Sequence, residues 1–202
     1  MSRGVRVLET IDLACWRGER AVFAGLDLRV RPGGATLLLG QNGAGKSSLL
    51  RVLAGLLPAA AGRITWQGQD VREDPAAHAR RLRYLGHLDA LKPALTVREN
   101  LAFHAALTGG AVEPALAALG LSALAELPGR MLSAGQRRRL ALARLALAPA
   151  AIWLLDEPTL GLDAASVERL GALLAAHRAQ GGLVIAATHL PLPLPGAEEF
   201  RL

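Results

Sequence analysis

The sequence predicts an α/β fold in which a parallel sheet carries a helical insertion. Short apolar runs bounded by glycine, such as residues 35–39, are typical of buried parallel strands. Helical patterns follow these runs, and residues 96–148 have helical spacing almost throughout. Strand and helix patterns then resume, as expected when a helical block interrupts a series of βα units.

The first half of the chain begins with strand patterns. Residues 5–11 and 22–30 alternate in the manner of strands, and Arg-Pro-Gly-Gly at 31–34 predicts a turn. Ala-Thr-Leu-Leu-Leu at 35–39 predicts a buried strand. The pattern then predicts a helix at 46–57, a strand at 62–67 and a helix at 75–83.

The second half opens with the helical block, in which even the alanine-rich stretch 111–125 keeps helical spacing of its leucines. Two apolar runs, at 151–155 and 183–187, predict further strands, and residues from Ala164 onward are helical in pattern. We therefore expect a sheet that is completed by segments on both sides of the helical block.

Composition limits the possible classes of protein. The chain has 202 residues, of which 51% are hydrophobic and 20% charged, so it is an ordered domain and not a disordered tail. Aromatic residues make up 3%, so the core is expected to be built from Ala, Leu and Val. The single Cys15 excludes an internal disulfide or a cysteine zinc site and fits a reducing compartment. No apolar run approaches the roughly 18 residues of a membrane span, and no signal-peptide core is present, so we expect a cytoplasmic address.

The chain is basic, with a formal net charge of +6. The arginines are spread along the sequence and few aromatics are available for base stacking, so we expect no nucleic-acid partner. Arg137, Arg138 and Arg139 form the only run of three, which we interpret as a solvated or dimer-facing first turn of a helix. Lysine occurs only at Lys46 and Lys92. Because the chain otherwise uses Arg, a lysine at position 46 suggests a specific chemical role.

Residues 40–47 read Gly-Gln-Asn-Gly-Ala-Gly-Lys-Ser, the G-x-x-x-x-G-K-[ST] pattern, between a predicted strand and a predicted helix. Glycines let the backbone turn tightly, so that consecutive N–H groups and a helix N-terminus face phosphate. Lys46 is expected to reach the β- and γ-phosphates, and the Ser47 hydroxyl to ligate Mg²⁺. The predicted nucleotide contacts here are Gly40, Gln41, Asn42, Gly43, Ala44, Gly45, Lys46, Ser47 and Ser48.

Residues 152–158 read Ile-Trp-Leu-Leu-Asp-Glu-Pro, which places two carboxylates after a buried strand. Ligands bind at the carboxyl ends of strands in open α/β sheets. We expect Asp156 to hold Mg²⁺, usually through water, and Glu157 to orient and polarise the attacking water.

Further motifs follow in a fixed order: Leu132-Ser-Ala-Gly-Gln136 before a helix, Gly161-Leu162-Asp163, and His189 after a strand. With the phosphate loop and the acidic pair, the sequence resembles the nucleotide-binding domain of ATP-binding cassette (ABC) transporters over essentially its whole length. The resemblance implies a P-loop NTPase (RecA-like) parallel sheet core with an N-terminal antiparallel β subdomain. It also implies an inserted α-helical subdomain at about residues 88–148, all within a single ATP-binding domain, 1–202.

The resemblance implies a role for each motif residue. Ser133, Gly135 and Gln136 would contact the ATP bound by a second copy of the chain. His189 would hydrogen-bond the γ-phosphate, and Asp163 would help to join the two copies. A simpler alternative stays open for Ser133 and Asp163, since each could serve only as a helix N-cap.

The sequence also departs from the family pattern. His87 follows Tyr84-Leu85-Gly86 where many members have a glutamine that touches Mg²⁺ and the membrane subunit. Near the N-terminus, Arg17 stands where members stack an aromatic ring on adenine, and Trp16 is one position away. Either could stack, by its ring or by its guanidinium plane, and the choice stays open.

Several of these features together resemble one subfamily, the ATP-binding subunits of the haem exporter of bacterial cytochrome c maturation. They are the Tyr-Leu-Gly-His sequence, the stretch 95–101, Trp153, and the segment 181–192. The resemblance implies an ATPase that binds ATP and Mg²⁺, dimerises, and sits peripherally on the cytoplasmic face of the inner membrane beside an integral membrane subunit. The alternatives are an ABC exporter for lipids, drugs or lipoproteins, or a soluble ABC ATPase that acts on nucleic acid.

Overall fold

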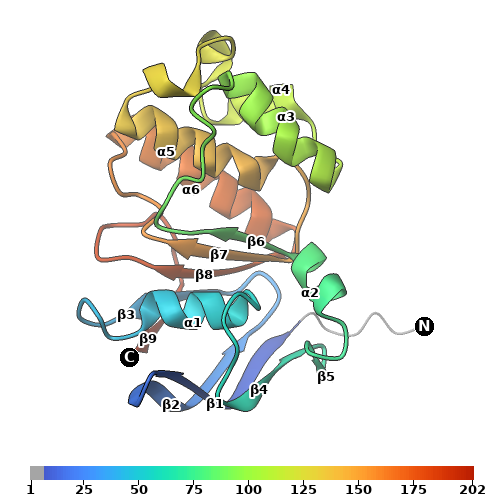
Figure 1. The fold of residues 1–202 in the computed structure, drawn as a ribbon, viewed down its shortest axis with the longest axis vertical. Helices are drawn as coiled ribbons and strands as arrows, with labels where there is room; N and C mark the ends of the chain where they lie inside the picture. Colours follow the sequence, from blue (N-terminus) through green and yellow to red (C-terminus); the bar gives the residue numbers. More distant parts are fainter. Residues whose placement is uncertain (1–6) are drawn as a thin grey trace.

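The computed structural model describes residues 7–202 and contains two sheets (Figure 1). An antiparallel sheet has the order β2-β1-β4-β5, formed by β1 (Leu8–Arg17), β2 (Arg20–Val30), β4 (Ala61–Trp66) and β5 (Gln69–Asp70). A parallel sheet has the order β6-β7-β8-β3-β9, formed by β6 (Leu82–Leu85), β7 (Ile152–Asp156), β8 (Leu183–Ala187), β3 (Ala35–Leu39) and β9 (Glu198–Arg201). The predicted fold class, a parallel core beside an antiparallel N-terminal sheet, is confirmed.

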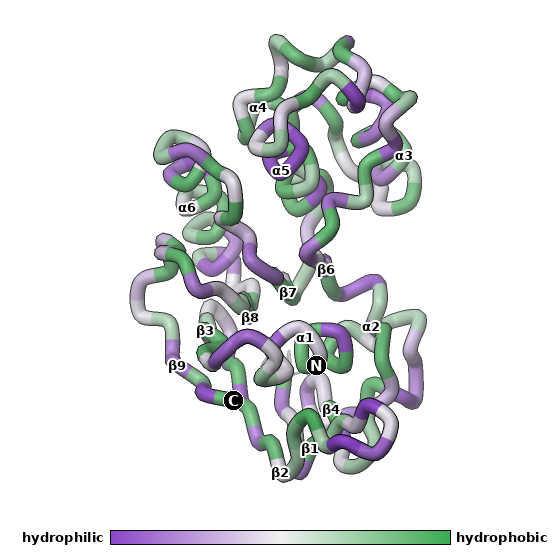
Figure 2. Tube along the Cα trace, turned by 60° about the vertical axis from the view of Figure 1, so that its left-hand side comes forward, coloured by the Kyte–Doolittle hydropathy of each residue, from purple (hydrophilic) through white to green (hydrophobic). Residues whose placement is uncertain are grey.

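The helices lie on both faces of the parallel sheet. Helix α1 (Lys46–Leu53) lies between the two sheets, while the long helices of the second half cover the opposite face of the parallel sheet (Figure 1). The other helices are α2 (Pro75–Arg81), α3 (Val97–Thr108), α4 (Val112–Ala118), α5 (Ala134–Ala143) and α6 (Ala164–Ala179). Short 3-10 turns occur at Ser122–Leu124, Gly129–Met131 and Arg144–Ala146. Figure 2 shows α3, α4 and α5 at the end of the molecule opposite β1 and β2.

The apolar strands of the parallel sheet explain how two cores form from one sheet. In β7, Ile152 and Leu154 belong to the core shared with α1 and the antiparallel sheet, whereas Trp153 and Leu155 belong to the core beneath the helical half. The residues of β8 divide between the same two cores in alternation. Because successive side chains of a strand point to opposite faces, a run of five apolar residues fills both layers.

Local sequence signals set where the helices begin. Thr96 caps α3 and Ser133 caps α5, each in a reciprocal capping box with Glu99 and Gln136, respectively. Asp163 caps α6, where its carboxylate accepts a hydrogen bond from the Ser166 backbone N–H at 2.8 Å. Hydrogen bonding from the Ser166 side chain, and then from its backbone N–H, lowers the pKa of Asp163, because both favour the charged form.

Several predicted boundaries are wrong. The first strand extends to Arg17, although Val5 and Arg6 lie outside the described residues. Helix α1 ends at Leu53 and not at residue 57, since Gly55 adopts a φ of 72°. The helix predicted at 75–83 ends at Arg81, because residues 82–85 pair with β7 as strand β6. Strands β5 and β9 were not predicted at all.

No helix within residues 7–202 is both long enough and apolar enough to cross a membrane. This agrees with the sequence, in which charged residues and prolines interrupt the apolar runs.

Candidate functional site

The glycine loop joins β3 to α1 through backbone conformations that other residues rarely adopt. Gly40, Gly43 and Gly45 have φ values of 148°, 87° and 105°. At Gly45 a side chain is excluded a second time, since an added Cβ would lie 2.6 Å from Val22 Cγ1 on β2. The loop therefore needs these glycines for its shape, which brings its backbone to the N-terminus of α1.

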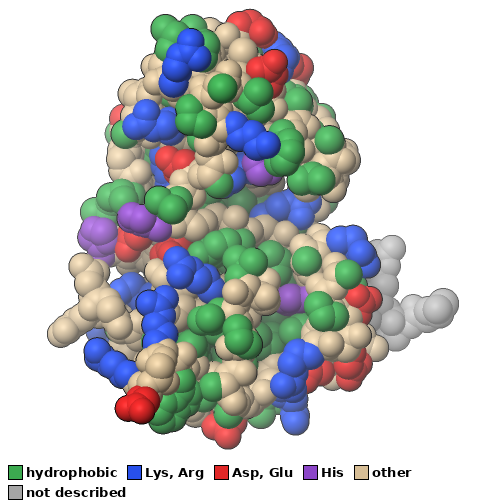
Figure 3. Space-filling view, viewed as in Figure 1, with side chains coloured by type: hydrophobic (Ala, Val, Ile, Leu, Met, Phe, Trp, Pro, Cys, Tyr) green, Lys and Arg blue, Asp and Glu red, His purple; other side chains and the backbone are tan. Residues whose placement is uncertain are grey.

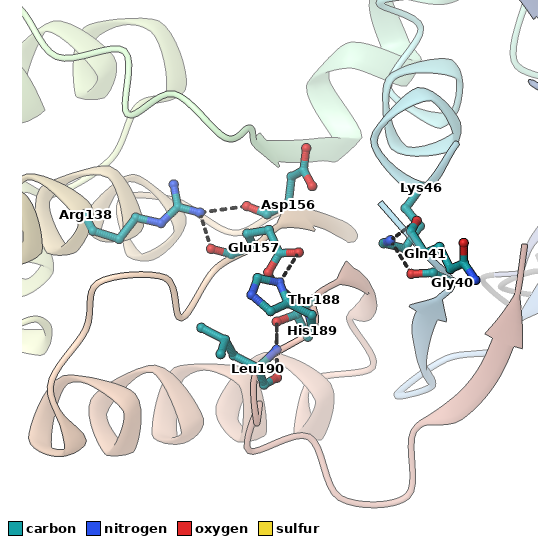
Figure 4. A network of polar contacts seen from close by, with 9 residues as sticks. All are labelled: Gly40, Gln41, Lys46, Arg138, Asp156, Glu157, Thr188, His189 and Leu190. Atoms are coloured by element: carbon teal, nitrogen blue, oxygen red, sulfur yellow. Dashed lines mark hydrogen bonds and ion pairs between the residues drawn. The ribbon is translucent and has the colours of Figure 1, made fainter. Parts of the chain in front are cut away.

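Lys46 is the first residue of α1 and is 9% exposed. Its Nζ donates hydrogen bonds to the carbonyl oxygens of Gly40 at 2.7 Å and Gln41 at 3.0 Å (Figure 4). The ammonium group is thus folded back over the loop, at the point where the loop would enclose a phosphate.

The two acids follow β7 and differ in their surroundings. Asp156 is 3% exposed, and its Oδ2 atom is buried without a hydrogen-bond partner. Glu157 is half-buried and has a φ of 48°, which a non-glycine residue adopts rarely. Its backbone N–H donates to the Ala187 carbonyl at the end of β8, with an N–O distance of 2.8 Å.

His189 follows β8 and meets Glu157 (Figure 4). His189 Nδ1 lies 3.0 Å from Glu157 Oε1, and the His189 backbone N–H donates to Glu157 Oε2 at 3.4 Å. The loop is shaped by Thr188, whose hydroxyl donates to the Leu190 carbonyl and accepts from the Leu190 N–H. The predicted base and the predicted γ-phosphate sensor are therefore brought together.

Arg138 contradicts the interpretation of its run as solvated or dimer-facing, because it is only 4% exposed. Its Nη2 donates to the carbonyl oxygens of Asp156 and Glu157, at 2.7 and 2.6 Å (Figure 4). Its Nη1 donates to the Gly86 carbonyl at 3.1 Å and to Asp89 Oδ1 at 3.0 Å. These acceptors, supplied by other segments of the chain, make burial of the guanidinium possible.

A cavity of about 740 Å³ lies between the glycine loop, the two acids and His189. Residues 42–48 line it together with the acidic pair and His189, and His87 also borders it. Arg17 lines the cavity, but Trp16 does not and is 51% exposed. The sequence analysis missed two charged cavity residues, Arg20 on β2 and Arg51 on α1, and the apolar lining residues Ala21, Val22 and Leu160. Helical spacing could have revealed Arg51, since it follows Ser47 by one turn.

Residues 23–160 match the family described as ABC transporter. The chain belongs to the ABC transporter family. Two curated relatives carry the name "Cytochrome c biogenesis ATP-binding export protein CcmA". The one from Rhodospirillum rubrum is 61% identical over 95% of this chain and 83% of its own length. The one from Paramagnetospirillum magneticum is 56% identical over 95% of this chain and 91% of its own length. The resemblance to this subfamily is thus confirmed.

Solved structures of ABC proteins have the same fold. One, titled as the ATP-binding subunit of an ABC transporter, superposes with a TM-score of 0.83 at 25% identity, covering 91% of this chain and 80% of the other. An ABC transporter ATP-binding protein from Pyrococcus furiosus gives a TM-score of 0.82 at 23% identity, covering 97% of both chains. This ABC protein therefore binds ATP and is an ATPase, as the sequence predicted.

The signature residues of this ABC protein lie apart from its own cavity. Ser133, Gly135 and Gln136 are not among the residues that line it. Ser133 accepts a hydrogen bond from the Gln136 N–H, and the Gln136 amide oxygen accepts one from the Ser133 N–H. Gly135 lies against the 161–163 segment, since an added Cβ would be 2.8 Å from the Gly161 carbonyl oxygen. A single copy thus places the signature where it does not meet its own nucleotide loop.

Proposed function

We propose that this ABC ATPase powers the haem exporter of c-type cytochrome biogenesis, as a dimer bound to an integral membrane subunit. The observation that carries the proposal is the 61% identity, over 95% of the chain, to a relative named as a cytochrome c biogenesis export protein. Haem itself would be handled by other subunits, so the work of this chain is to convert ATP hydrolysis into movement.

The nucleotide would lie in the 740 Å³ cavity, with its phosphates on the loop at 40–48. Gly40 and Gln41 would shape the loop, the amides of residues 42–48 would face the phosphates, and the Lys46 ammonium would turn from the loop carbonyls to phosphate oxygens. Arg17 is favoured over Trp16 for stacking on adenine, because it lines the cavity.

The donor set also fits Mg²⁺. Asp156 Oδ2 is buried without a partner, and both Asp156 and Ser47 line the cavity, so a carboxylate and a hydroxyl of the kind that Mg²⁺ prefers belong to one site. Asp156 and Ser47 would hold the ion, with His87 in contact through water. When bound, Mg²⁺ would neutralise charge on the phosphate oxygens.

Hydrolysis would depend on the acidic pair and His189. Glu157 would accept a hydrogen bond from the attacking water and polarise it. His189, now bonded to Glu157, would donate a hydrogen bond to the γ-phosphate. Because the two side chains are bonded, a movement of one would change the position of the other.

The signature supports a shared nucleotide site. In the capping box the Ser133 oxygen only accepts, so its hydroxyl hydrogen is free to donate to a phosphate. Together with Gly135, Gln136 and the positive N-terminus of α5, it would complete the ATP site of a second copy. Loss of the γ-phosphate would weaken the contact between the two copies. The segment around His87 would transmit the resulting movement to the membrane subunit.

The setting follows from the family. The chain would act as one ATP-binding domain, 1–202, with its helical subdomain at about 88–148, attached peripherally to the cytoplasmic face of the bacterial inner membrane. Nucleic acid is not expected as a partner. On the face drawn in Figure 3, Lys and Arg side chains are spread over both halves and not gathered in one stripe.

Deletion of the gene, followed by a haem stain for c-type cytochromes, tests the proposal. We expect the cytochromes to disappear, and to return with the wild-type gene or with Arg29→Ala, an exposed β2 arginine paired with Glu9. Lys46→Ala and Glu157→Gln should not restore them. Cytochromes that persist after deletion would refute the haem assignment and favour an exporter of lipids, drugs or lipoproteins.

A further inference from the structure

We propose that Arg138 is a positioning residue for hydrolysis, which holds the backbone of Glu157 and ties it to the segment 86–89. The position of α5 against the parallel sheet would then decide whether Glu157 points at the nucleotide. This inference rests on the proposed role of Glu157 in ATP hydrolysis.

One guanidinium joins three parts of the chain. Arg138 lies on α5, and its four hydrogen bonds go to the carbonyls of Asp156 and Glu157 after β7, and to Gly86 and Asp89 after β6. The distances, between 2.6 and 3.1 Å, are those of well-formed bonds. Gly86 and Asp89 flank His87, the residue that borders the nucleotide cavity.

The bond to Glu157 acts on a backbone that needs support. Glu157 has a φ of 48° and precedes Pro158, and both features disfavour its conformation in a free chain. Its N–H is fixed by the Ala187 carbonyl at 2.8 Å, and its carbonyl is fixed by Arg138 at 2.6 Å. Residues in such conformations persist only where the surroundings hold them, and the two bonds are on opposite sides of the strained Cα.

The neighbouring arginines do not make this connection. Arg137 donates to the Leu132 carbonyl, and Arg139 donates to the carbonyls of Leu119 and Gly120. All three acceptors lie in the helical half of the chain, so their bonds do not reach the sheet. Among the three arginines of this run, only Arg138 has hydrogen bonds that cross from α5 to the segments after β6 and β7.

The Asp89 ion pair adds a link that can respond to outside contacts. Asp89 is about one-quarter exposed at its side chain, whereas that of Arg138 is 5% exposed. A shift of the segment 86–89 would move the Arg138 guanidinium, which also binds the backbone carbonyls of Asp156 and Glu157. Movement of this segment and the aim of the Glu157 carboxylate would therefore be coupled through four hydrogen bonds.

The chemistry predicts a separation of turnover from binding. Arg138 does not line the nucleotide cavity and has no bond to the loop at 40–48, so ATP affinity should not depend on it. A small misplacement of a catalytic group is enough to cost a large factor in rate. Loss of Arg138 should thus lower kcat and leave KM nearly unchanged.

The test compares steady-state Mg-ATP hydrolysis by the purified chain and its variants. We expect Arg138→Gln to lower kcat at least 20-fold and to change KM less than three-fold. Arg138→Lys keeps the charge without the planar fork and should recover less than one-fifth of kcat. Asp89→Asn, which weakens one of the four bonds, should lower kcat about three-fold at constant KM.

Arg178→Gln is the matched control. Arg178 also joins two distant carbonyls, those of Gly33 and Pro195, but lies outside the cavity lining. Circular dichroism and thermal unfolding show whether each variant is folded. If Arg138→Gln does not fold, Arg138→Lys and Asp89→Asn decide the matter.

Three results would overturn the inference: wild-type kcat in Arg138→Lys, equal losses of kcat in Arg138→Gln and Arg178→Gln, or a KM that rises as kcat falls. Glu157→Gln, measured alongside, separates this inference from the proposed function. If Glu157→Gln hydrolyses ATP at the wild-type rate, the proposed role of Glu157 fails. If it is inactive while Arg138→Gln is active, only the positioning role fails.

Discussion

His189 Nδ1 lies 3.0 Å from Glu157 Oε1, so two residues that follow β8 and β7 are joined side chain to side chain. The backbone N–H of His189 points to the other carboxylate oxygen at 3.4 Å. Two oxygens of one carboxylate thus bind one residue, which limits the directions that the Glu157 side chain can take.

This relationship predicts that His189 is needed for turnover and not for nucleotide capture. His189→Ala should lower kcat at least 30-fold and alter KM less than three-fold, because it removes both a donor to phosphate and a contact that orients Glu157. Phosphate release by the purified chain measures both parameters. His104→Gln, on α3, is the control, and equal losses in both variants would refute the prediction.

Glu157→Gln should stop hydrolysis and trap the ATP-bound dimer. The amide keeps the shape of the side chain but is a poor proton acceptor, so the complete ATP site should persist. We expect kcat to fall at least 100-fold, and analytical ultracentrifugation with Mg-ATP to show a dimer. A variant that remains monomeric with ATP would count against the shared nucleotide site.

Gly135→Ala should weaken that dimer, since the new methyl group would meet the Gly161 carbonyl oxygen at 2.8 Å. Either the start of α5 or the 161–163 segment must move, and both belong to the proposed interface. In the Glu157→Gln background, we expect dimer affinity to fall at least ten-fold with ATP binding to the monomer unchanged. Ala134→Gly is the control, and an unweakened dimer in Gly135→Ala would be the contrary result.

Arg17→Ala should lower the affinity for ATP three- to ten-fold, whereas Trp16→Ala should not. Arg17 lines the cavity, and its guanidinium plane can lie on the adenine ring. Calorimetric titration of the purified chain with ATP distinguishes the two residues. The opposite order of effects would assign the stacking role to Trp16.

Two buried histidines predict a loss of stability in acid. Burial lowers the pKa of His177 and of His78 below the ordinary value of 6.5, while the unfolded chain titrates near that value. The unfolded state therefore binds more protons as pH falls, so stability is retained above about pH 6.5 and lost below it. The urea concentration at the unfolding midpoint should decrease when the pH is lowered from 7.5 to 5.5.

His177→Gln isolates one contribution to this pH dependence. His177 stacks on Trp153 with a ring separation of 3.9 Å, and its Nε2 lies 3.1 Å from the Leu183 carbonyl. The variant should be less stable at pH 7.5 but should lose less of its remaining stability in acid. A drop between the two pH values as large as in the wild type would assign the effect elsewhere.

The sequence predicts well those parts whose cause is local. The strand at 35–39 is entirely confirmed, because an apolar run before a glycine loop has few alternatives. The cavity likewise gathers the phosphate loop, the acids and His189 from short contiguous motifs. The single domain, 1–202, and the chemical roles of the site residues stay predictions.

The remaining features depend on partners distant in sequence. β9 reads Glu-Glu-Phe-Arg and lacks a strand pattern, so its pairing with β3 is decided by the sheet. Residues 82 and 83, which continue a helical pattern, belong to strand β6 because they pair with β7. Arg138 is buried by acceptors after β6 and β7, which no inspection of its own run could reveal.

The central place of β8 in the parallel sheet has a consequence for synthesis on the ribosome. β8 pairs with β7 on one side and β3 on the other, so Leu38 meets Ala187 across most of the chain length. A growing chain that has been synthesised as far as Glu157 still lacks β8. This strand lies between β3, which leads into the glycine loop, and β7, which precedes the acidic pair. Such distant pairing is slow and leaves apolar edges open to aggregation. The nascent protein should therefore acquire ATP binding only after β8 has left the exit tunnel, and should need protection by chaperones until then.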